Sequence, residues 1–421
     1  MKKFISKIKT LSQEKRHMLF LFWVYQFVQA ITGTFVGIFV FLQQDSFGFL
    51  AVYTLCMIVG LWLGFVGFGY LVSRLQVSIK KNYLYSFIFS FMAFIILSLI
   101  KQPIIPLVFG FLNGIGIGIF WLTNHSYEML YTKNEYDDRD FYSSIEQSGN
   151  QAIAIIAPLL ATVLAILSER VFNVETFTLL FWFLPLVFLI AIPFLFSLPD
   201  YIPQKLSLKK KLLFIDTPQQ RDITTYNLVS AFDQVRGLVT IFFSVLALET
   251  VINIGAWESV VGVLALLITL LLANVRYEKN RVAIMSYAVI GFIIAFSLLF
   301  FVEKSFVFYM IFSILFVVVK PIHSVSRHTI DLYSLDVLGK ARDSFYPGLL
   351  YRETLLNVGR VVILLIIVGL AFVVKDNLLM GKISIGIYLF FLIIHFFYAK
   401  KVSGGQYKIP KTTRGYSEVK L

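Results

Sequence analysis

The chain has 421 residues, of which 58% are hydrophobic, 17% aromatic and 14% charged, and its mean hydropathy is +0.81. Soluble domains are about 45–50% apolar and about 25% charged, so this composition excludes a soluble globular protein. The single cysteine, Cys56, excludes a disulfide framework and a metal site built from several cysteines.

Apolar runs recur along the chain, and each is long enough to cross a bilayer, which takes about 20 residues per helix. They predict an all-α integral membrane protein with about twelve transmembrane helices. The spans are expected to start near Met18, Phe47, Asn82, Ile104, Ser143, Thr176, Asn227, Asn253, Val282, Ser305, Gly348 and Leu378.

The net charge of +13 is distributed unevenly about these spans. Of the 37 Lys and Arg residues, 27 lie in the two tails, the central loop and the loops on one side; five lie on the other side and five in or at the ends of spans. The positive-inside rule therefore places both termini in the cytoplasm. The excess of Lys and Arg thus follows from the orientation of the chain in the membrane, and it favours anionic membrane lipid as a partner. No nucleic acid partner is expected.

The first spans carry a few polar groups. Gln26 and Gln29 lie three residues apart in span one and share a helix face. The loop after span two reads Gly69-Tyr70-Leu71-Val72-Ser73-Arg74 and is followed by Lys80 and Lys81. The basic tail before span one, 1–17, is expected either to lie on the inner membrane face or to be solvated.

Span four ends in NHSYEML, residues 124–130, where His125 and Glu128 share a helix face. Two interpretations stay open: a solvated helix end, or polar contacts that close the inner side of the protein. A metal site would need further ligands, so no metal is expected.

Span five begins close to Glu146 and contains Ala157-Pro158-Leu159-Leu160-Ala161-Thr162. A carboxyl group in a poorly hydrated environment has a raised pKa and can exchange protons near neutral pH. Glu146 is expected either to carry protons or to form a salt bridge, for which Arg139 is the nearest cation. Small residues around a membrane proline allow a kink and close packing.

The longest polar interruption lies near the middle of the chain and includes Lys209-Lys210-Lys211. It divides the spans into six and six. We expect five parts: a cytoplasmic tail at 1–17, an N-terminal six-helix bundle at 18–198, a cytoplasmic linker at 199–225, a C-terminal six-helix bundle at 226–398 and a cytoplasmic tail at 399–421.

Charged residues inside the later spans are costly unless they face a partner or a wet cavity. Asp233 and Arg236 share a face of span seven, either as an ion pair or as part of a cavity. Lys320 precedes Pro321 and could satisfy a carbonyl freed by the broken helix. Arg360 lies deep in span eleven. These four carry three positive charges and one negative charge, which favours an anionic ligand.

The stretch RHTIDLY, residues 327–333, ends span ten and repeats the pattern of NHSYEML. His328 and Asp331 follow His125 and Glu128 by 203 residues. An Arg-Asp pair comes after each stretch, and then Glu146-x-x-x-Asn150 in the first half and Glu353-x-x-x-Asn357 in the second. Three matches in the same order predict a duplication. Glu353 has the same two interpretations as Glu146, with Arg352 as its salt-bridge partner.

Twelve spans, a basic central linker, cytoplasmic termini and two parallel six-span repeats resemble the major facilitator superfamily. The family signature after span two has the form Gly-x-Leu-Ala-Asp-Arg; Gly69, Leu71 and Arg74 match it, while Ser73 replaces the acidic residue. The stretch Ala157–Thr162 resembles the Gly-Pro-x-x-Gly-Gly motif of the antiporters in that family.

The resemblance implies a transporter that works by alternating access around a site near the membrane midplane. It implies a cavity lined by the first helix of each half, where Gln26, Gln29, Asp233 and Arg236 lie. Together with the deep cations Lys320 and Arg360, these residues form the predicted substrate site. It also implies proton coupling through Glu146 and Glu353 and a cytoplasmic gate formed by Arg74, His125, Glu128, Arg327, His328 and Asp331.

We therefore expect a monomeric secondary active transporter in the cytoplasmic membrane. It would move a small organic solute, anionic or amphiphilic, by proton-coupled export as an antiporter. Two alternatives remain: a flippase for a lipid or lipid-linked precursor, and a non-transporting membrane sensor or assembly factor with the same fold. Neither an enzymatic activity nor a cofactor is expected.

Overall fold

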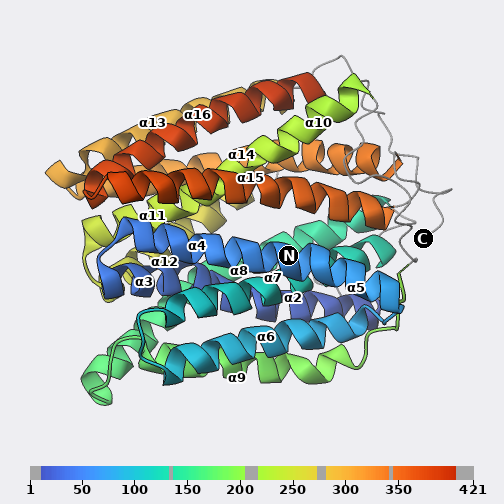
Figure 1. The fold of residues 1–421 in the computed structure, drawn as a ribbon, viewed down its shortest axis with the longest axis horizontal. Coiled ribbons are helices and arrows are strands. Elements are labelled where there is room, and N and C mark those ends of the chain that lie inside the picture. The colour runs from blue at the N-terminus through green and yellow to red at the C-terminus, as the bar shows by residue number, and fades with distance from the viewer. Residues whose placement is uncertain (1–10, 132–135, 204–216, 273–280, 341–344, 404–421) are drawn as a thin grey trace. The chain divides into compact units, whose positions relative to one another are not determined.

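The computed structural model describes residues 11–131, 136–203, 217–272, 281–340 and 345–403. Within these ranges the side chains of 129–131, 136–144, 147, 269–272, 281, 325, 328–329, 332, 336, 339–340 and 345 are not described. The described residues form helices joined by short turns, without a strand (Figure 1). The all-α class expected from the sequence is confirmed.

Twelve helical segments in these ranges are long and apolar enough to cross a membrane. They are Gln13–Gln44, Phe47–Leu75, Lys80–Leu99, Ile105–Glu128, Ser148–Val171, Thr178–Leu195, Pro218–Leu248, Val251–Ile268, Val282–Lys304, Val307–Ser324, Tyr346–Val373 and Asn377–Ser403. The expected number of spans is thus confirmed, and the chain is an integral membrane protein.

Contacts divide the chain into two compact units. The first unit comprises Met1–Gly33 and Gly60–Leu206, and the second comprises Thr34–Val59 and Ser207–Leu421. Sequence analysis assigned Thr34–Val59 to the N-terminal bundle, whereas its contacts group it with the second unit.

The first unit is built mainly from five α-helices. They are α2 (Gln13–Ile31), α6 (Lys80–Leu99), α7 (Ile105–Tyr131), α8 (Tyr136–Ile166) and α9 (Thr178–Leu195). Helix α6 packs against α7 and α9, and α2 packs against α8 and α9. Stacked aromatic rings fill this core; Tyr25 of α2 lies on Phe120 of α7 with ring centroids 3.6 Å apart.

The first unit also contains a short helix α5 (Phe68–Leu75), and α8 continues into the π-helical turn η3 (Leu167–Val171). Helix α5 ends beside Arg74, after which Gln76 adopts a left-handed backbone conformation with φ of 53°. Proline residues lie inside both α8, at Pro158, and α9, at Pro185 and Pro193.

The second unit contains the long helices of the C-terminal half. They are α10 (Pro218–Val229), η4 (Ser230–Phe232), α11 (Asp233–Leu248), α12 (Val251–Leu272), α13 (Arg281–Leu298), η5 (Leu299–Lys304), α14 (Val307–Lys340), α15 (Phe345–Val373) and α16 (Asn377–Ser403). Helix α14 packs against α13, α12 and α15, while α10 packs against α15 and α16.

Helix α10 starts earlier than the sequence analysis placed span seven. It begins at Pro218, inside the stretch expected to be linker, rather than near Asn227. The local signals explain this start, because the Thr217 side chain accepts a hydrogen bond from the Gln220 amide and proline occupies the first helical turn. Its first residues are polar, so hydropathy alone missed them.

Spans one and two are each interrupted by a π-helical segment. Span one runs α2, η1 (Thr32–Val36) and α3 (Gly37–Gln44); span two runs α4 (Phe47–Trp62), η2 (Leu63–Gly67) and α5. The division between the two units falls inside η1 and just before η2. Such segments bend helices because one residue leaves the regular hydrogen-bond ladder.

Glycine allows very close helix contacts in both units. A Cβ atom on Gly118 of α7 would lie 2.2 Å from the carbonyl oxygen of Leu61, and one on Gly359 of α15 would lie 2.2 Å from that of Leu228. Gly118 and Gly359 therefore let neighbouring helices approach where a larger side chain would clash.

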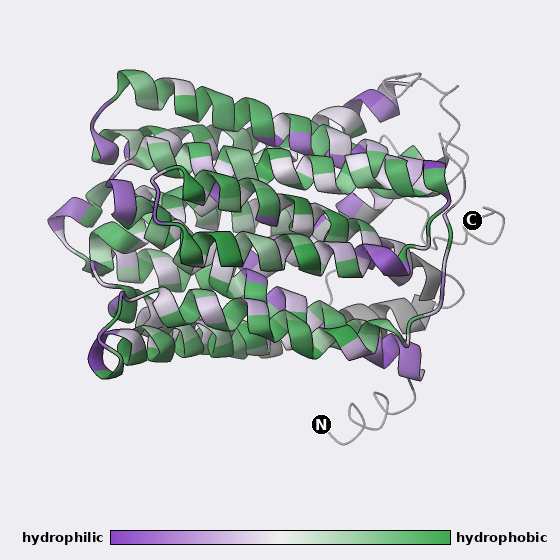
Figure 2. Ribbon diagram, turned by 60° about the horizontal axis from the view of Figure 1, so that its bottom comes forward, coloured by the Kyte–Doolittle hydropathy of each residue, from purple (hydrophilic) through white to green (hydrophobic). Residues whose placement is uncertain are grey.

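Hydrophobic residues run along the helices, and hydrophilic residues concentrate near their ends (Figure 2). Large apolar side chains are exposed on helix surfaces, including Leu186 (56% exposed) and Ile190 (59%) on α9 and Leu365 (53%) on α15. In a membrane protein, exposed apolar side chains on the helices can contact the lipid chains directly.

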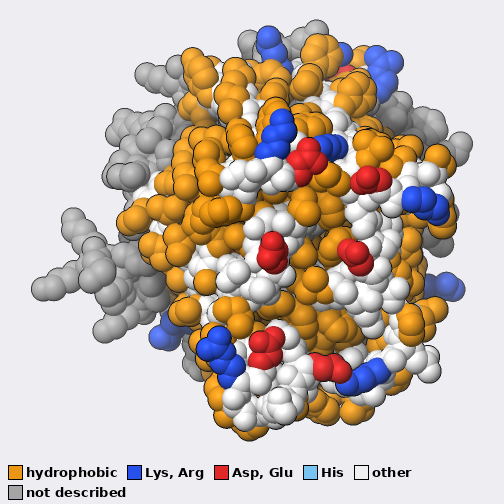
Figure 3. Space-filling model, turned by 90° about the vertical axis from the view of Figure 1, so that its left-hand side faces the viewer, with side chains coloured by type: hydrophobic (Ala, Val, Ile, Leu, Met, Phe, Trp, Pro, Cys, Tyr) orange, Lys and Arg blue, Asp and Glu red, His pale blue; other side chains and the backbone are white. Residues whose placement is uncertain are grey.

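Charged side chains at the helix ends pair with one another. Lys101 lies 2.5 Å from Glu175 in the first unit, and Lys382 lies 2.9 Å from Glu303 in the second. Figure 3 views one end of the molecule, where acidic and basic side chains lie among hydrophobic and polar ones.

Candidate functional site

The start of α11 carries the first charged pair of the second unit. Asp233 and Arg236 lie three residues apart, and the Arg236 Nη1 atom is 3.3 Å from the Asp233 Oδ1 atom. Both side chains are 24% exposed. The structure therefore shows the intrahelical ion pair that the spacing allowed.

Arg327 of α14 adds a second cation to Asp233. Its guanidinium donates to the Asp233 carboxylate, and its Nε atom lies 3.4 Å from Asp331 Oδ2, one turn further along α14. Asp233 thus pairs with two arginines from two helices. Sequence analysis paired it with Arg236 alone.

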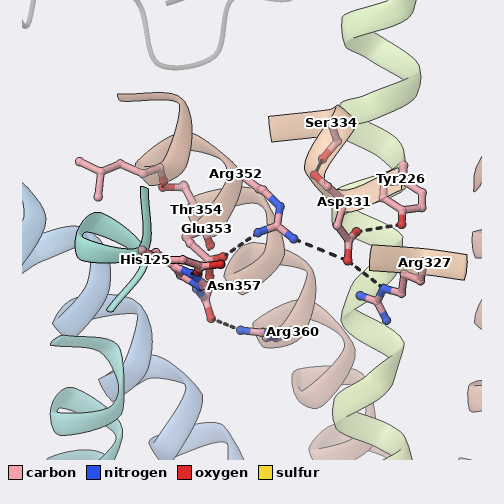
Figure 4. A network of polar contacts seen from close by, with 12 residues as sticks. His125, Tyr226, Arg327, Asp331, Ser334, Arg352, Glu353, Thr354, Asn357 and Arg360 are labelled. Carbon is pink, nitrogen blue, oxygen red and sulfur yellow. Dashed lines mark hydrogen bonds and ion pairs between the residues drawn. The ribbon is translucent and has the colours of Figure 1, made fainter. Parts of the chain in front are cut away.

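Asp331 connects this pair to α15, as Figure 4 shows. It accepts a hydrogen bond of 2.8 Å from the Tyr226 hydroxyl and lies 3.8 Å from the Arg352 guanidinium. Arg352 in turn lies 3.4 Å from the neighbouring Glu353. We call this set the charge network: Asp233, Arg236, Arg327, Asp331, Arg352 and Glu353.

Arg360 lies beyond the charge network on α15. Its Nη1 atom donates to Asn357 Oδ1 at 3.1 Å, and the Asn357 amide donates to the Glu353 carbonyl at 2.8 Å. Arg360 forms no ion pair with a described residue, although Glu353 and Asp233 are near enough to interact with it electrostatically. Its guanidinium therefore retains donors for a further acceptor.

Lys320 of α14 is more than a third exposed. Its ammonium lies 5.7 Å from the centre of the Phe316 ring, and the Arg236 guanidinium lies at the same distance from that ring. No hydrogen bond joins Lys320 to a backbone carbonyl in the described part of the chain. The carbonyl-capping role is therefore not seen.

Glu258 of α12 was missed by the sequence analysis. It lies seven residues into its helix, is partly buried, and interacts electrostatically with Lys320. The rule that a charge inside a span marks a functional position would have found it in the run WESVVGVLALL.

Glu258 and the charge network change the charge balance of the second unit. Among the described residues, this group comprises five cations and four carboxylates rather than the three and one considered from sequence. The cations are Arg236, Lys320, Arg327, Arg352 and Arg360, and the carboxylates are Asp233, Glu258, Asp331 and Glu353. The positive surplus is one rather than two.

In the first unit, polar residues gather where α7 and α8 carry Glu128 and Glu146. The His125 Nδ1 atom lies 3.4 Å from Glu128, and the His125 ring stacks on Trp121 with centroids 5.2 Å apart. The Trp23 indole donates to the Glu146 carbonyl at 3.3 Å. Helix α2 thus contacts α8 at Glu146, ten residues after the start of α8.

Glu146 lies just before the candidate span that starts at Ser148. Burial raises the pKa of its carboxyl group to about 8, and the neighbouring Glu128 carboxylate adds to the shift while a hydrogen bond with Asn124 opposes it. A carboxyl group with this pKa can take up and release a proton near neutral pH.

The remaining predicted residues lie in separate places. Gln26 and Gln29 are partly buried on α2 of the first unit. Arg74 is exposed at the end of α5 and forms no ion pair with a described residue. The side chain of His328 lies outside the described residues, as does that of Arg139. Within the second unit, Arg327 and Asp331 pair with residues of their own unit.

Solved structures share this fold at low sequence identity. The nucleoside transporter NupG is 12% identical, with a TM-score of 0.62 over 94% of this chain and 100% of that chain. A POT family transporter in complex with a thioalcohol-conjugated peptide is 13% identical, with a TM-score of 0.67 over 94% and 99%. The human organic anion transporter MFSD10 is 13% identical, with a TM-score of 0.62 over 92% and 100%.

No protein-family model and no curated protein matches the sequence. At these identities the solved structures show the fold alone, which this chain shares with twelve-helix transporters. The expected all-α fold with about twelve spans is confirmed.

Proposed function

We propose that the chain is a secondary active transporter for small organic anions. The shared fold supports transport, and Lys320 and Arg360 support an anionic substrate. Each of these cations lies inside a span without an ion pair in the described structure. Charges at such depth are retained where a ligand or a wet cavity requires them.

Alternating access between the two halves is the proposed mechanism. In this proposal the protein resides in the cytoplasmic membrane with both termini inside, as the distribution of Lys and Arg favours. The polar residues His125, Glu128, Arg74 and Arg327 would take part in closing the inner side. No chemical step is assigned to the protein.

The proposed coupling ion is the proton, and Glu146 is the preferred carrier. Glu353 is the weaker candidate because Arg352 lies 3.4 Å from its carboxylate. The span-five stretch around Pro158 supports export: Ala157 and Ala161 are fully buried, and Thr162 donates to the Pro158 carbonyl at 2.9 Å. Close packing of this kind was expected from the antiporter-like sequence.

The substrate proposal is tested by ligand-induced thermal stabilisation of the purified protein. A panel of organic anions is compared with neutral and cationic analogues of the same size. Anions should stabilise the wild type, and Arg360→Lys should weaken that effect because an ammonium cannot reproduce the guanidinium fork. The exposed Arg170→Lys serves as the matched control. Stabilisation by cationic analogues alone would refute the proposal.

The coupling proposal is tested with Glu146→Gln in liposomes. Proton-driven accumulation should be lost while substrate exchange continues, because a carboxamide keeps the shape but cannot carry a proton. Accumulation at the wild-type rate would exclude Glu146 as the carrier.

Thermal stability as a function of pH gives a second measurement that needs no substrate. The folded protein holds the Glu146 proton up to about pH 8, whereas the ordinary pKa of this group is 4.5. The folded state therefore binds more protons than the unfolded state between these values, so stability falls as pH rises through this window. Glu146→Gln should make this part of the profile flatter.

A further inference from the structure

Arg360 differs from the other arginines around the charge network in its nearest partner. Arg236, Arg327 and Arg352 each have a carboxylate oxygen within 4.0 Å of the guanidinium. Arg360 instead donates to the neutral side-chain oxygen of Asn357 at 3.1 Å (Figure 4). Among the described residues, Arg360 is thus the arginine of this group that has an amide where the others have a carboxylate.

The side chain of Asn357 is fixed in its orientation. It is 0% exposed, and its amide nitrogen donates to the backbone carbonyl of Glu353, one turn earlier on α15, at 2.8 Å. Because the nitrogen is used in this bond, the amide oxygen faces Arg360; the reverse orientation of the amide would lose both hydrogen bonds. Asn357 therefore holds the guanidinium in place without cancelling its charge.

The guanidinium of Arg360 has further N–H donors beyond the one that Asn357 accepts. The side chain is partly exposed and lies about 21 Å along its span from Tyr346, at 1.5 Å per residue. The carboxylate of Glu353 is already paired with Arg352 at 3.4 Å. A carboxylate or phosphate group of a ligand can accept from two parallel donors of a guanidinium. Arg360 therefore offers an oriented positive charge to such an oxyanion.

The first half of the chain has the asparagine of this arrangement but not the arginine. In the predicted repeat, Asn150 is the counterpart of Asn357. Three residues later the first half has Ile153 where the second half has Arg360. The buried Oδ1 atom of Asn150 has no hydrogen-bond partner among the described residues. Of these two asparagines, the one followed by an arginine is thus the one whose oxygen is bonded.

We propose that Asn357 is a positioning residue that makes the site selective for anions. It orients Arg360 toward the oxyanion group of the substrate and leaves the charge of the guanidinium uncompensated. This inference rests on the anion transport proposed above. A carboxylate in the place of Asn357 would orient Arg360 as well, but it would neutralise the guanidinium and compete with the substrate. The neutral amide orients the guanidinium without this competition.

The experiment compares binding of benzoate and phenyl phosphate to the purified full-length protein by calorimetry. Asn357→Asp should weaken the binding of both anions about 30-fold or more, because the new carboxylate pairs with Arg360. Benzamide has the shape of benzoate without its charge, so it should not distinguish this variant from the wild type. Thermal unfolding without ligand is measured on the same samples.

A second variant separates charge from packing. Asn357→Leu removes both hydrogen bonds without adding a charge, so anion binding should weaken only about three- to tenfold. It leaves the Glu353 carbonyl and Arg360 without their partner, and it should melt at a lower temperature than Asn357→Asp. The variant that is less stable should thus bind anions better. Asn150→Asp, the same change at the matching position of the first half, should bind anions as the wild type does.

The possible results distinguish this inference from the proposed function. Affinity at the wild-type level in Asn357→Asp or in Asn357→Leu would overturn the positioning role and leave the anion transporter proposal intact. Binding losses that simply follow the melting temperatures of the two variants would also overturn it, because a purely structural role predicts that order. If Asn357→Asp does not fold, the affinity of Asn357→Leu decides. Absence of binding of both anions to the wild type would overturn the anion proposal and this inference together.

Discussion

At the residue scale, Asp233 is central to the second unit because two cations depend on it. Arg236 approaches it from the same helix and Arg327 approaches it from α14. Arg327 also has Asp331, whereas Arg236 has no second carboxylate within ion-pair distance among the described residues. Removal of Asp233 would therefore leave Arg236 without a partner, whereas removal of Arg236 would leave Asp233 paired with Arg327.

Removal of Asp233 should be the most damaging single change in this group. Asp233→Asn leaves Arg236 unpaired in a span and should cost about 3 kcal/mol of unfolding free energy. Arg236→Gln should cost only about 1 kcal/mol, because Asp233 keeps Arg327. Thermal and denaturant unfolding in detergent would measure both.

The double variant Asp233→Asn with Arg236→Gln distinguishes a simple pair from the charge network. A simple pair predicts that the double variant is tolerated better than Arg236→Gln alone. The observed contacts predict the reverse, because the double variant weakens the neutralisation of Arg327 while Arg236→Gln does not. A double variant as stable as the wild type would contradict the network.

At the element scale, helices α10 and α15 pack closely together beside the charge network. Gly359 lies next to Arg360, and its missing side chain allows the backbone of α10 to approach at Leu228. Ala231 of η4 also lies against this position. The close contact sets the separation of two helices that carry Tyr226, Arg352 and Glu353.

Gly359→Ala should destabilise the protein and disturb anion binding. The added Cβ would lie 2.2 Å from the Leu228 carbonyl oxygen, so the helices must move apart. Gly369→Ala on the same helix is the matched control, because no atom lies within 4 Å of the added Cβ. We expect a melting temperature lower by several degrees for Gly359→Ala and an unchanged or slightly higher one for Gly369→Ala. Equal effects would refute the packing role.

At the scale of the whole molecule, the proposed orientation in the membrane rests on the uneven distribution of Lys and Arg. The π-helical turn η3 contains Arg170 and belongs to the side poor in basic residues, whereas Lys209-Lys210-Lys211 is assigned to the basic side. Ser168 is fully buried and would label poorly, so Val171, which is 64% exposed, is the better position for a probe.

Cysteine labelling tests this orientation. In a Cys56→Ser background, Val171→Cys should react with a membrane-impermeant thiol reagent in intact cells, and Ser207→Cys should react only after permeabilisation. Both results follow if the basic side faces the cytoplasm. Labelling of Ser207→Cys from outside would reverse the topology and, with it, the proposed inner gate.

The sequence by itself determined the membrane class and the number of spans. These properties depend on local composition, because any run of about 20 apolar residues must satisfy its backbone as a helix in lipid. Two ion pairs could also be predicted from the sequence, because both partners of each pair lie on the same helix. They are Asp233 with Arg236 on α11 and Arg352 with Glu353 on α15.

Only the tertiary structure decided which charges meet across helices. Arg327 pairs with Asp233, from which it is 94 residues distant in the chain, and Glu258 of α12 acts on Lys320 of α14. Neither partner follows from periodicity, because helix packing brings distant residues together. The start of α10 and the π-helical segments were likewise missed, since they depend on capping and packing rather than on hydropathy.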